Sequence, residues 1–569
     1  MNRAAHLARL KSESFDICII GAGASGAGCA ADAASRGLRV AVIESDDFGA
    51  GTSGTSTKLV HGGVRYLEQA VKTLDPKQLS LVRKALHERR TLLHIAPHLC
   101  HPLALLTPCA NLVEGAYYAI GLKVYDWLAG SRRMASSKWL NKAEALHHFP
   151  AFDGSKLHSA VLYYDGQFDD IRLNLGLVQT AAKHGAAVVN HVRISSLVAD
   201  KTGQINAVEA LDTLSGESFT IRAKVIVNAT GTHADGLRQQ ANNQQGQRMR
   251  ASTGAHVILP GSAMPQASSQ AEPAALLVPK TKDGRVLFAI PWRGQWLIGT
   301  TDTEADPTDV PALLPDEAAY LLAEVNQFVV QPIPVSAIAG GFAGLRPLLQ
   351  SDPNASSKAV VRDHEVEIDP VSGLISIMGG KWTTYRLMAQ ETIDACCTKL
   401  GETRPCVTEE LLLQGAEGYD TNYPHRLAER HPDMAPAVLA HLADTYGTEA
   451  PAILKLLAEN KAWRTLLAHN HPFIQAEVIY AARTEMALTL PDVLMRRIRL
   501  GLIDWQATLE SIPVSARLLS SELGWSPVET AQNEADFQAH IEGLIGKATG
   551  VEMGSTAPAD QFNRSGGPV

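Results

Sequence analysis

The spacing of apolar and polar positions predicts a βαβ unit near the start of the chain. Residues 15–20 (FDICII) form a short, almost continuous apolar run, which is typical of a strand buried on both faces. Small residues follow over 24–37 in a pattern that predicts a helix, and Gly37 ends it. A second apolar run, LRVAVIE, ends at Glu44 and predicts the next strand.

Later segments continue the alternation. Helical spacing of Leu and Val predicts helices over 78–96 and 171–185, the second leading into the strands AAVVN and RISSLVA. Further strands are expected at 223–228, 286–290, 296–300 and 374–378. Residues 239–276 are rich in Gln, Asn, Ser, Ala and Pro and predict loops. From about residue 400 the pattern becomes helical.

Composition bounds the class of protein. The chain has 569 residues, of which 45% are hydrophobic and 19% charged, so a large core and more than one domain are expected. A net charge of −8 gives no attraction to nucleic acid. The seven cysteines contain no CxxC pair, which favours reduced cytosolic thiols over disulfides or a zinc site. We expect no metal, no signal peptide in the first 13 residues and no membrane-spanning run.

Three glycines give the predicted βαβ unit its chemistry. Gly21, Gly23 and Gly26 follow a strand and open a helix, the context in which a GxGxxG pattern indicates a dinucleotide. Gly21 permits the tight turn, Gly23 lets a pyrophosphate approach the backbone, and Gly26 lets the helix lie close to the sheet. Glu44 ends the second strand, where a carboxylate can accept both hydrogens of a ribose diol. The unit does not specify which dinucleotide.

The next segment favours a flavin over a nicotinamide. Residues 49–67 read GAGTSGTSTKLVHGGVRYL, with hydroxyl side chains followed by a second pair of glycines. Hydroxyls and backbone amides of this kind can surround the pyrophosphate of a tightly held FAD, and glycines can lie flat beside its ring. A polar loop without a ligand is the alternative reading of this segment.

Several motifs together resemble the FAD-dependent glycerol-3-phosphate dehydrogenases, with the respiratory branch nearest. The resemblance covers roughly residues 15–545 and rests on FDICIIGAGASGAG, GTSGTSTKLVHGGVRYLE, ALHERRTLLHIAPHL, YYDGQFDDIRLNL, VNATG, GAHVILP, IPWRGQWLIGTTD, GLRPL, GGKWTTYR and AEVIYAARTEMALTLPDVLMRRIRLG. Two features depart from the mitochondrial members. The chain has no DxDxDG-type loop, which argues against calcium control, and no transit peptide, which points to a bacterial origin.

The resemblance implies an α/β fold in three parts. An FAD-binding Rossmann-like domain of the glutathione-reductase and amino-acid-oxidase type is interleaved with an α+β antiparallel-sheet substrate domain, and a helical C-terminal domain follows. The implied FAD domain comprises 15–100, 155–235 and 355–398, the substrate domain 101–154 and 236–354, the helical cap 399–548, and a disordered tail 549–569.

The resemblance also implies the site residues. Its flavin contacts correspond to Gly21, Gly23, Gly26, Glu44, Thr52, Ser53, Ser56, Thr57, Gly62, Gly63, Ile194, Gly231, Gly380, Lys381, Trp382 and Thr383, with His61 as a neighbour. The implied reaction oxidises sn-glycerol 3-phosphate to dihydroxyacetone phosphate, with the C2 hydride passing to flavin N5. Its substrate-binding candidates are Arg65, Tyr66, Arg362, Lys381 and Thr383.

Two residues are expected to perform the chemistry. His256 takes the hydroxyl proton, since a near-neutral pKa suits a general base, and Arg346 polarises the developing alkoxide. The division of roles between them stays open. The acid pairs Asp46-Asp47 and Asp169-Asp170 are interpreted as helix starts or surface acids, and the Arg496-Arg497-Arg499 cluster as solvated.

The family implies that electrons pass to ubiquinone or menaquinone at the inner face of the cytoplasmic membrane, with the protein bound there peripherally. Residues 110–133 mix apolar and aromatic side chains and could lie in a bilayer interface, or form a buried helix pair. A homodimer is left open. The alternatives are a glycerol-3-phosphate oxidase that uses dioxygen, an amino-acid or amine oxidase on the same fold, and a non-catalytic flavoprotein scaffold.

Overall fold

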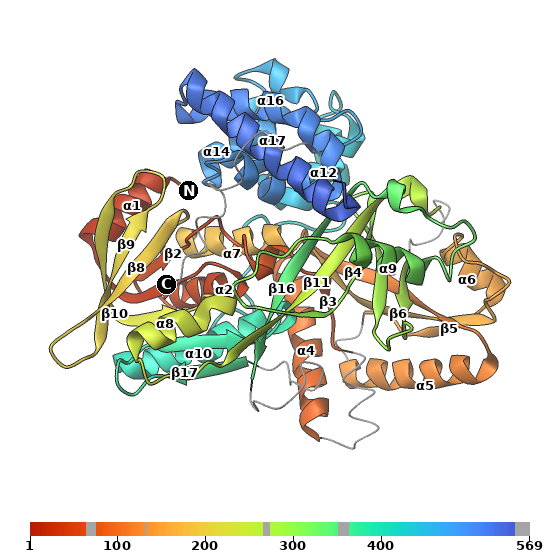
Figure 1. Cartoon of the computed structure of the whole chain (residues 1–569), viewed down its shortest axis with the longest axis horizontal. Helices are drawn as coiled ribbons and strands as arrows, with labels where there is room; N and C mark the ends of the chain where they lie inside the picture. Colours follow the sequence, from red (N-terminus) through yellow and green to blue (C-terminus); the bar gives the residue numbers. More distant parts are fainter. Residues whose placement is uncertain (64–75, 131–133, 266–273, 351–363, 552–569) are drawn as a thin grey trace.

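The computed structural model describes residues 1–63, 76–130, 134–265, 274–350 and 364–551. In this part of the chain two sheets, one of eight strands and one of ten, form the base of the molecule, and a group of helices lies above them (Figure 1). Arg65, Tyr66, Arg362 and all but the first three residues of the predicted tail lie outside the described residues.

The first sheet is built on the predicted βαβ unit. Its strands follow the order β17-β18-β10-β1-β2-β7, with β9 pairing β10 and β8. The four pairings that join β18, β10, β1, β2 and β7 are parallel. The bounds are β1 Ser14–Ile20, β2 Val40–Ile43, β7 Ala187–Val189, β8 Val192–Ala199, β9 Ile205–Asp212, β10 Ser218–Asn228, β17 His364–Ile368 and β18 Ile375–Gly379.

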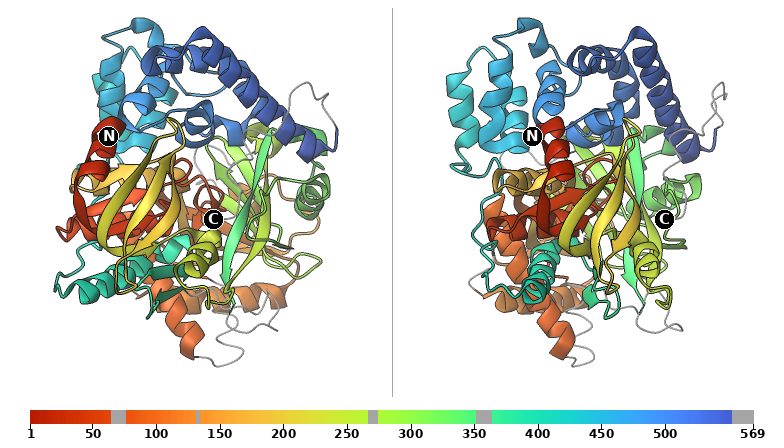
Figure 2. Two further views of the ribbon diagram at one scale, coloured as in Figure 1. Left: turned by 60° about the vertical axis from the view of Figure 1, so that its left-hand side comes forward. Right: turned by 90° about the vertical axis from the view of Figure 1, so that its left-hand side faces the viewer.

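Helices cover the first sheet because its strands are apolar on both faces. Helix α2 (Ala24–Ser35) packs against both α7 (Asp170–Lys183) and α10 (Tyr385–Leu400), and its small Ala and Gly residues allow the close approach. Helices α1 (Arg3–Ser12) and α8 (Ala234–Ala241) also contact this sheet. The adjoining antiparallel strands β8 and β9, in yellow, face the viewer in both views of Figure 2.

The second sheet is mainly antiparallel and carries the other half of the site. Its order is β15-β11-β14-β13-β12-β4-β6-β3, with β16 on β11 and β5 on β6. The strands are β3 Leu59–Val60, β4 Cys100–Cys109, β5 Lys138–Asn141, β6 Ser159–Phe168, β11 Met249–Pro260, β12 Ala274–Val278, β13 Leu287–Trp292, β14 Gln295–Gly299, β15 Thr303–Ala305 and β16 Gly340–Leu349. Its helices are α4 Pro76–Ile95, α5 Leu112–Ala129, α6 Lys142–His148 and α9 Pro315–Val325.

The C-terminal part is helical, as the sequence pattern predicts. Its helices are α11 Tyr423–Arg430, α12 Pro436–Tyr446, α13 Ala450–Leu456, α14 Gln475–Thr484, α15 Leu500–Ile503, α16 Trp505–Leu523 and α17 Pro527–Thr549, with a π-helical turn at Asp492–Arg497. Apolar residues of α14, α15 and α16 join the core of the second sheet. The second sheet and these helices therefore share one hydrophobic core, whereas the first sheet packs in clusters of its own.

The predicted fold class is confirmed. The segment 239–276, predicted to contain loops, has an irregular stretch at 242–248 but also contains β11 at 249–260, which pairs with β14, β15 and β16. The apolar half of this strand, AHVILP, is buried in the second sheet, which outweighs the polar residues around it. The domain boundaries stay a prediction; β3 and β6, from segments predicted for the FAD domain, pair within the second sheet.

Candidate functional site

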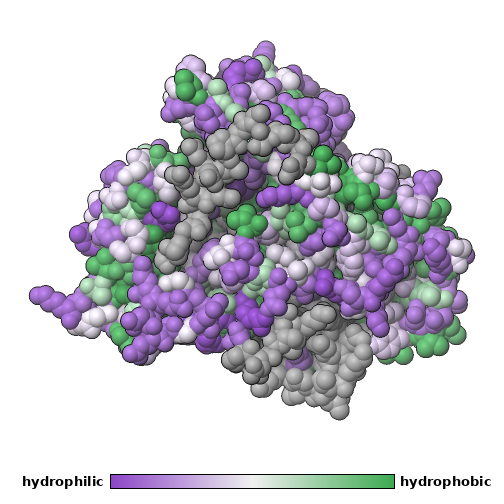
Figure 3. Space-filling view, viewed as in Figure 1, coloured by the Kyte–Doolittle hydropathy of each residue, from purple (hydrophilic) through white to green (hydrophobic). Residues whose placement is uncertain are grey.

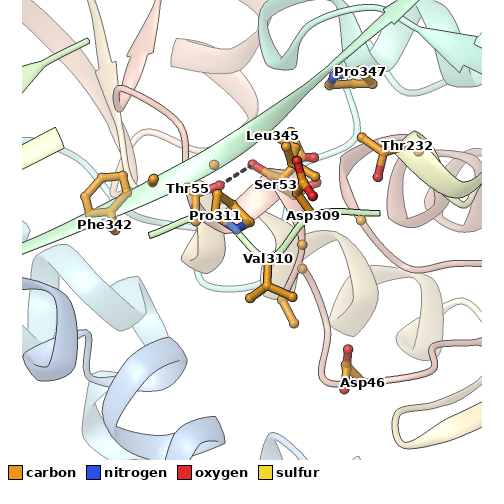
Figure 4. A pocket seen from close by; sticks show the side chains of 18 of the residues that line it. Asp46, Ser53, Thr55, Thr232, Asp309, Val310, Pro311, Phe342, Leu345 and Pro347 are labelled. Atoms are coloured by element: carbon orange, nitrogen blue, oxygen red, sulfur yellow. Dashed lines mark hydrogen bonds between the residues drawn. The ribbon is translucent and has the colours of Figure 1, made fainter. Parts of the chain in front are cut away.

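One large cavity runs between the two sheets and the C-terminal helices. Its volume is about 3030 Å³, and its wall includes the turn after β1, the end of β2, strand β16 and helix α17. Figure 4 shows part of it: Ser53 and Thr55 come from the loop after β2, Phe342, Leu345 and Pro347 from β16, and Val310 from the loop before α9. The parallel strands therefore point their carboxyl ends into a cavity large enough for a dinucleotide and a small substrate.

The glycine turn after β1 leaves bare backbone at the cavity wall. Gly21 has φ +96°, and a Cβ placed on it would lie 2.6 Å from the Ala229 carbonyl oxygen. A Cβ on Gly26 would overlap the Gly21 carbonyl, so α2 packs directly against the turn. Gly23 caps α2 without a side chain, and the α2 N-terminus faces the cavity. The positive end of the helix dipole favours an anion here.

Glu44 ends β2 and lines the same cavity. Its carboxylate accepts hydrogen bonds from the Ala22 amide at 2.7 Å and the Asp46 amide at 3.1 Å, which fix its orientation. Burial raises the pKa of Glu44 above its ordinary value, although these two amides lower it in part. The group is thus held beside the glycine turn, where the sequence predicts a diol ligand.

The loop at 49–57 is held from several directions. The Ser56 amide and hydroxyl both donate to Asp170, at 3.0 and 2.8 Å. Trp382 Nε1 donates to the Ser53 carbonyl at 2.9 Å, and the Ser53 hydroxyl accepts from the Ala24 amide at 2.8 Å. The loop is therefore joined both to the start of α2 and to the turn that follows β18.

The turn after β18 forms the opposite wall. Gly379 and Gly380 have φ of +72° and +89°, and a Cβ on Gly380 would overlap the Met388 side chain. Lys381 and Trp382 follow, and Thr383 Oγ1 accepts a hydrogen bond from the His61 amide at 3.3 Å. Only glycine adopts this backbone at little cost, which explains the pair at this position.

His256 lies on β11 and is 2% exposed. Its Nε2 is 3.0 Å from Thr57 Oγ1, and its ring stacks on Phe342 with centroids 4.7 Å apart and planes at 21°. Burial lowers the pKa of His256 well below its ordinary value, and the charges of Lys58 and Arg346 lower it further. The sequence-based expectation of a near-neutral pKa is therefore wrong, and the imidazole is neutral at neutral pH.

Arg346 lies on β16, the antiparallel neighbour of β11. Its guanidinium donates to Asp302 at 2.8 Å, to Thr300 Oγ1 at 2.9 Å and to the Thr301 carbonyl at 2.9 Å. A Cβ on Gly254 would overlap this guanidinium, so the arginine lies flat against bare backbone. Asp302 is a site residue that the sequence did not predict, although it ends the GTTD motif.

The structure brings most of the predicted site residues to the cavity wall. They are Gly21, Gly23, Glu44, Thr52, Ser53, Ser56, Thr57, Ile194, Gly231, His256, Arg346, Gly380, Lys381, Trp382 and Thr383. Among the described residues, Gly26, Gly62 and Gly63 do not line it. Gly62 instead donates its amide to the Tyr125 hydroxyl at 2.8 Å, which joins this segment to α5.

Asp169 caps α7 and Asp170 is its first residue, so this pair begins a helix as expected, although Asp170 is completely buried. The interpretation of Asp47 and of the arginine cluster as surface groups is wrong. Asp47 is completely buried. Arg497 and Arg499 are also completely buried, because Arg497 pairs with Asp47 and Arg499 with Asp170 across the interface with the C-terminal part. Burial of a charge requires a partner, and the sequence gives no sign of partners so distant.

Comparison with known proteins defines the class. Residues 16–386 match the family model described as FAD dependent oxidoreductase. Residues 406–530 match the model described as C-terminal domain of alpha-glycerophosphate oxidase. The two matches correspond to the sheets with their helices and to the helical C-terminal part.

Relatives narrow the class to one family. The chain is 40% identical over 557 residues to a probable mitochondrial glycerol-3-phosphate dehydrogenase of Caenorhabditis elegans, covering 96% of this chain and 75% of the relative. It is 40% identical over 537 residues to the mitochondrial glycerol-3-phosphate dehydrogenase of Homo sapiens, covering 92% and 73%. The chain belongs to the FAD-dependent oxidoreductases and, within them, to the glycerol-3-phosphate dehydrogenases.

Solved structures agree with this family. The glycerol-3-phosphate dehydrogenase of Bacillus halodurans, complexed with FAD, superposes with a TM-score of 0.77 at 27% identity over 97% of this chain and 99% of that one. L-alpha-glycerophosphate oxidase of Mycoplasma pneumoniae shares the fold, with a TM-score of 0.53 at 15% identity over 69% of this chain and 97% of that one.

FAD is the cofactor of this family, and the residues present fit it. The cradle at Gly21 and Gly23 has no room for a Cβ, as Gly21 faces a carbonyl and Gly23 the Ser53 hydroxyl. The Glu44 carboxylate stands beside this cradle, and the cavity extends from there to His256. The end of the cavity at Gly21, Gly23 and Glu44 therefore suits the adenosine diphosphate portion of FAD, and the end at His256 suits its flavin ring.

Proposed function

We propose that this chain oxidises sn-glycerol 3-phosphate to dihydroxyacetone phosphate with FAD. The observation that carries the proposal is the continuous cavity, whose wall includes the glycine turn after β1 as well as His256, Arg346 and Lys381. A dinucleotide site, a candidate base and cationic side chains in one cavity are what oxidation of a phosphorylated alcohol requires. The family to which the chain belongs supports the same substrate.

In this proposal the phosphate is bound by cations near the turn after β18. Of the proposed phosphate-binding cations, Lys381 is the one that lies within the described residues. It lines the cavity, as does Thr383. Arg65, Tyr66 and Arg362 lie outside the described residues and enter the proposal on the family motif alone. Ammonium and guanidinium groups suit a phosphate because they supply charge-assisted hydrogen bonds.

His256 and Arg346 act on the substrate hydroxyl. FAD, when bound, supplies the acceptor for the C2 hydride at its N5 atom. His256 is neutral and so is ready to accept the hydroxyl proton, with Thr57 orienting its Nε2. A weak base is sufficient because the hydroxyl becomes strongly acidic as the hydride leaves. Arg346, fixed by Asp302, stabilises the developing negative charge on the oxygen.

Anaerobic bleaching of the flavin tests the substrate. We expect sn-glycerol 3-phosphate to bleach it, and glycerol to do so only at far higher concentration. Lys381→Met should raise the concentration needed for half-maximal bleaching by about 10-fold or more, since a charge-assisted bond to phosphate is lost. Lys201→Met, at an exposed turn remote from the cavity residues, is the control. Bleaching by non-phosphorylated alcohols alone would reject the proposal.

A quinone is proposed as the electron acceptor. The near-complete coverage of the chain by relatives named dehydrogenases supports this acceptor over dioxygen. Reoxidation should be fast with a soluble ubiquinone or menaquinone analogue and slow in air-saturated buffer. Stoichiometric hydrogen peroxide formed at the same rate without quinone would instead identify an oxidase.

We propose that the protein reaches membrane quinone by peripheral attachment to the inner face of the cytoplasmic membrane, through α5. The helix bears a stripe at Val113, Tyr117, Ile120, Val124 and Trp127, and all but Val124 are at least half exposed. Apolar residues lie along the lower right margin of the molecule in Figure 3, where α5 lies in Figure 1. Apolar and aromatic side chains in such a row suit the interfacial region of a bilayer. No helix in the described ranges has the length and hydropathy to cross a membrane.

A further inference from the structure

Lys58 is a completely buried lysine next to the proposed site. Its Nζ donates to Asp170 Oδ2 at 2.5 Å and to the Gly54 carbonyl at 3.1 Å. Its φ is +62°, a conformation that residues other than glycine rarely adopt. An unfavourable backbone combined with a buried charge persists only where the surroundings impose it, and such positions concentrate at functional sites.

Two more cations bind the acid pair Asp169-Asp170. Arg499 donates to Asp170 Oδ1 at 3.0 Å, and Arg293 donates to Asp169 Oδ2 at 2.8 Å. These arginines also have positive φ, +72° and +51°. Three cations, Lys58 before β3, Arg499 in the C-terminal part and Arg293 in the β13–β14 turn, thus surround two carboxylates, which leaves an excess of positive charge.

This charge is in contact with the ring that supports His256. The Lys58 ammonium is 4.7 Å from the centroid of Phe342, and His256 stacks on the same ring. Lys58 also follows Thr57, whose hydroxyl meets His256 Nε2. Lys58 is therefore linked to the imidazole in two ways. Its charge lies against the ring on which the imidazole stacks, and its backbone adjoins Thr57, which contacts Nε2.

We propose that Lys58 is a positioning residue that holds His256 in its neutral, proton-accepting form, and that Asp170 adjusts the strength of this effect. The inference rests on the proposed function, in which His256 accepts the substrate proton. The ammonium disfavours a second positive charge on the nearby imidazole, since buried charges interact strongly at low dielectric.

The charged groups around His256 define the sign of the effect. Arg346 faces it from β16 with its partner Asp302, and Lys58 faces it from the residue before β3. Behind Lys58 lie Asp170, Arg499, Asp169 and Arg293. Removing a positive charge from this set stabilises the imidazolium, whereas removing a negative charge destabilises it.

The test is the rate constant of anaerobic flavin reduction by glycerol 3-phosphate as a function of pH. Protonated His256 cannot accept a proton, so the rate falls on the acid side. We expect Lys58→Met to move this acid limb to higher pH by about one unit and Asp170→Asn to move it to lower pH. Lys58→Arg, which retains the charge, should leave the limb in place.

Controls separate this role from a structural one. Arg36→Met breaks the buried pair with Asp32 in α2 and should leave the limb unmoved. If Lys58→Met and Asp170→Asn lose the flavin, Arg499→Met removes the other cation on Asp170 and should shift the limb upward. The inference is overturned if the variants lower the rate but leave the acid limb at the same pH. It is also overturned if Lys58→Met and Asp170→Asn both shift the acid limb in the same direction. If glycerol 3-phosphate does not bleach the flavin of the wild-type protein, the proposed function itself is refuted.

Discussion

Gly26 shows how one missing side chain permits the dinucleotide turn. It lies in the first turn of α2, and any Cβ there would overlap the Gly21 carbonyl. We expect Gly26→Ala to cost about 3 kcal/mol and to reduce FAD retention, because the helix must move away from the turn. The measurement is flavin content after gel filtration, with the unfolding midpoint in urea.

Gly176 provides the matched control. It is also a buried helical glycine, in α7, but a Cβ there would meet its neighbours no closer than 3.8 Å. Gly176→Ala should retain FAD and gain up to about 1 kcal/mol, since alanine is the better helix former. Equal flavin loss in the two variants would show that the overlap at Gly26 is not the cause.

The buried side chain of His98 should make the folded protein less stable in acid. Burial lowers its pKa to about 3, and the charge of Arg172 contributes. An unfolded histidine titrates near 6.5, so the unfolded state binds more protons and the contribution of His98 to stability is lost as pH falls below about 6.5. His98→Gln should flatten the decline of Tm between pH 6.5 and 4.5. A slope identical to that of the wild type would contradict this.

At the scale of elements, the sequence pattern predicts strands and helices whose apolar residues are contiguous or regularly spaced along the chain. The apolar runs at β1 and β2 and the glycines between them identify the βαβ unit, because a buried parallel strand must be apolar on both faces. The polar first half of β11 gives no strand pattern, and its pairing with β15 and β16 extends the strand back to Met249.

The site divides in the same way. The glycines, the hydroxyl loop and the turn after β18 are contiguous motifs and can be recognised. Lys58 meets Asp170 across 112 residues, and Arg499 meets Asp170 across 329. Such contacts depend on the packing of separate elements, so a single sequence carries no periodic signal for them.

Helix α5 has two faces with different expected roles. Tyr125 faces inward and bonds the Gly62 amide, whereas Tyr117, Ile120 and Trp127 are 50%, 68% and 74% exposed. Replacing these three by Ser should abolish flotation with vesicles of phosphatidylglycerol and phosphatidylethanolamine, since about 3–5 kcal/mol of apolar burial is lost. Flavin bleaching by glycerol 3-phosphate should be unchanged.

A control for α5 is available on another surface. Val528 in α17 is 78% exposed, and Val528→Ser should leave flotation intact. If the triple variant floats as well as the parent protein, α5 is not the contact, and a change in oligomeric state instead would identify the stripe as an interface between two copies.

At the scale of the whole molecule, buried ion pairs join the C-terminal helices to the first sheet and its helices. Glu485, after α14, accepts two hydrogen bonds from Arg172 of α7, at 2.9 and 2.7 Å. Asp47, after β2, is paired with Arg497. Both pairs are buried, and each joins segments more than 300 residues apart. The cavity lies between the parts they connect, so its shape depends on them.

Breaking one of these pairs should therefore destabilise the whole molecule. Burial raises the pKa of Glu485, but Arg172, Arg497 and Gln179 together lower it below its ordinary value, so the carboxylate is charged at neutral pH. Glu485→Gln leaves Arg172 buried without its charge partner and should cost about 3–5 kcal/mol in urea unfolding. Adding Arg172→Met should restore part of the loss, because the uncompensated charge is then gone.

The exposed pairs of Arg483 supply the comparison. Arg483 lies on α14 itself and binds Glu459 and Glu522 at the surface, so Arg483→Met should cost at most about 1 kcal/mol. Unfolding followed by flavin fluorescence and by far-ultraviolet circular dichroism should shift together in Glu485→Gln, because the helices and the flavin cavity share one core. If only the circular dichroism shifted while the flavin signal kept its midpoint, the C-terminal helices would unfold independently, and the Arg172–Glu485 pair would not hold the cavity together.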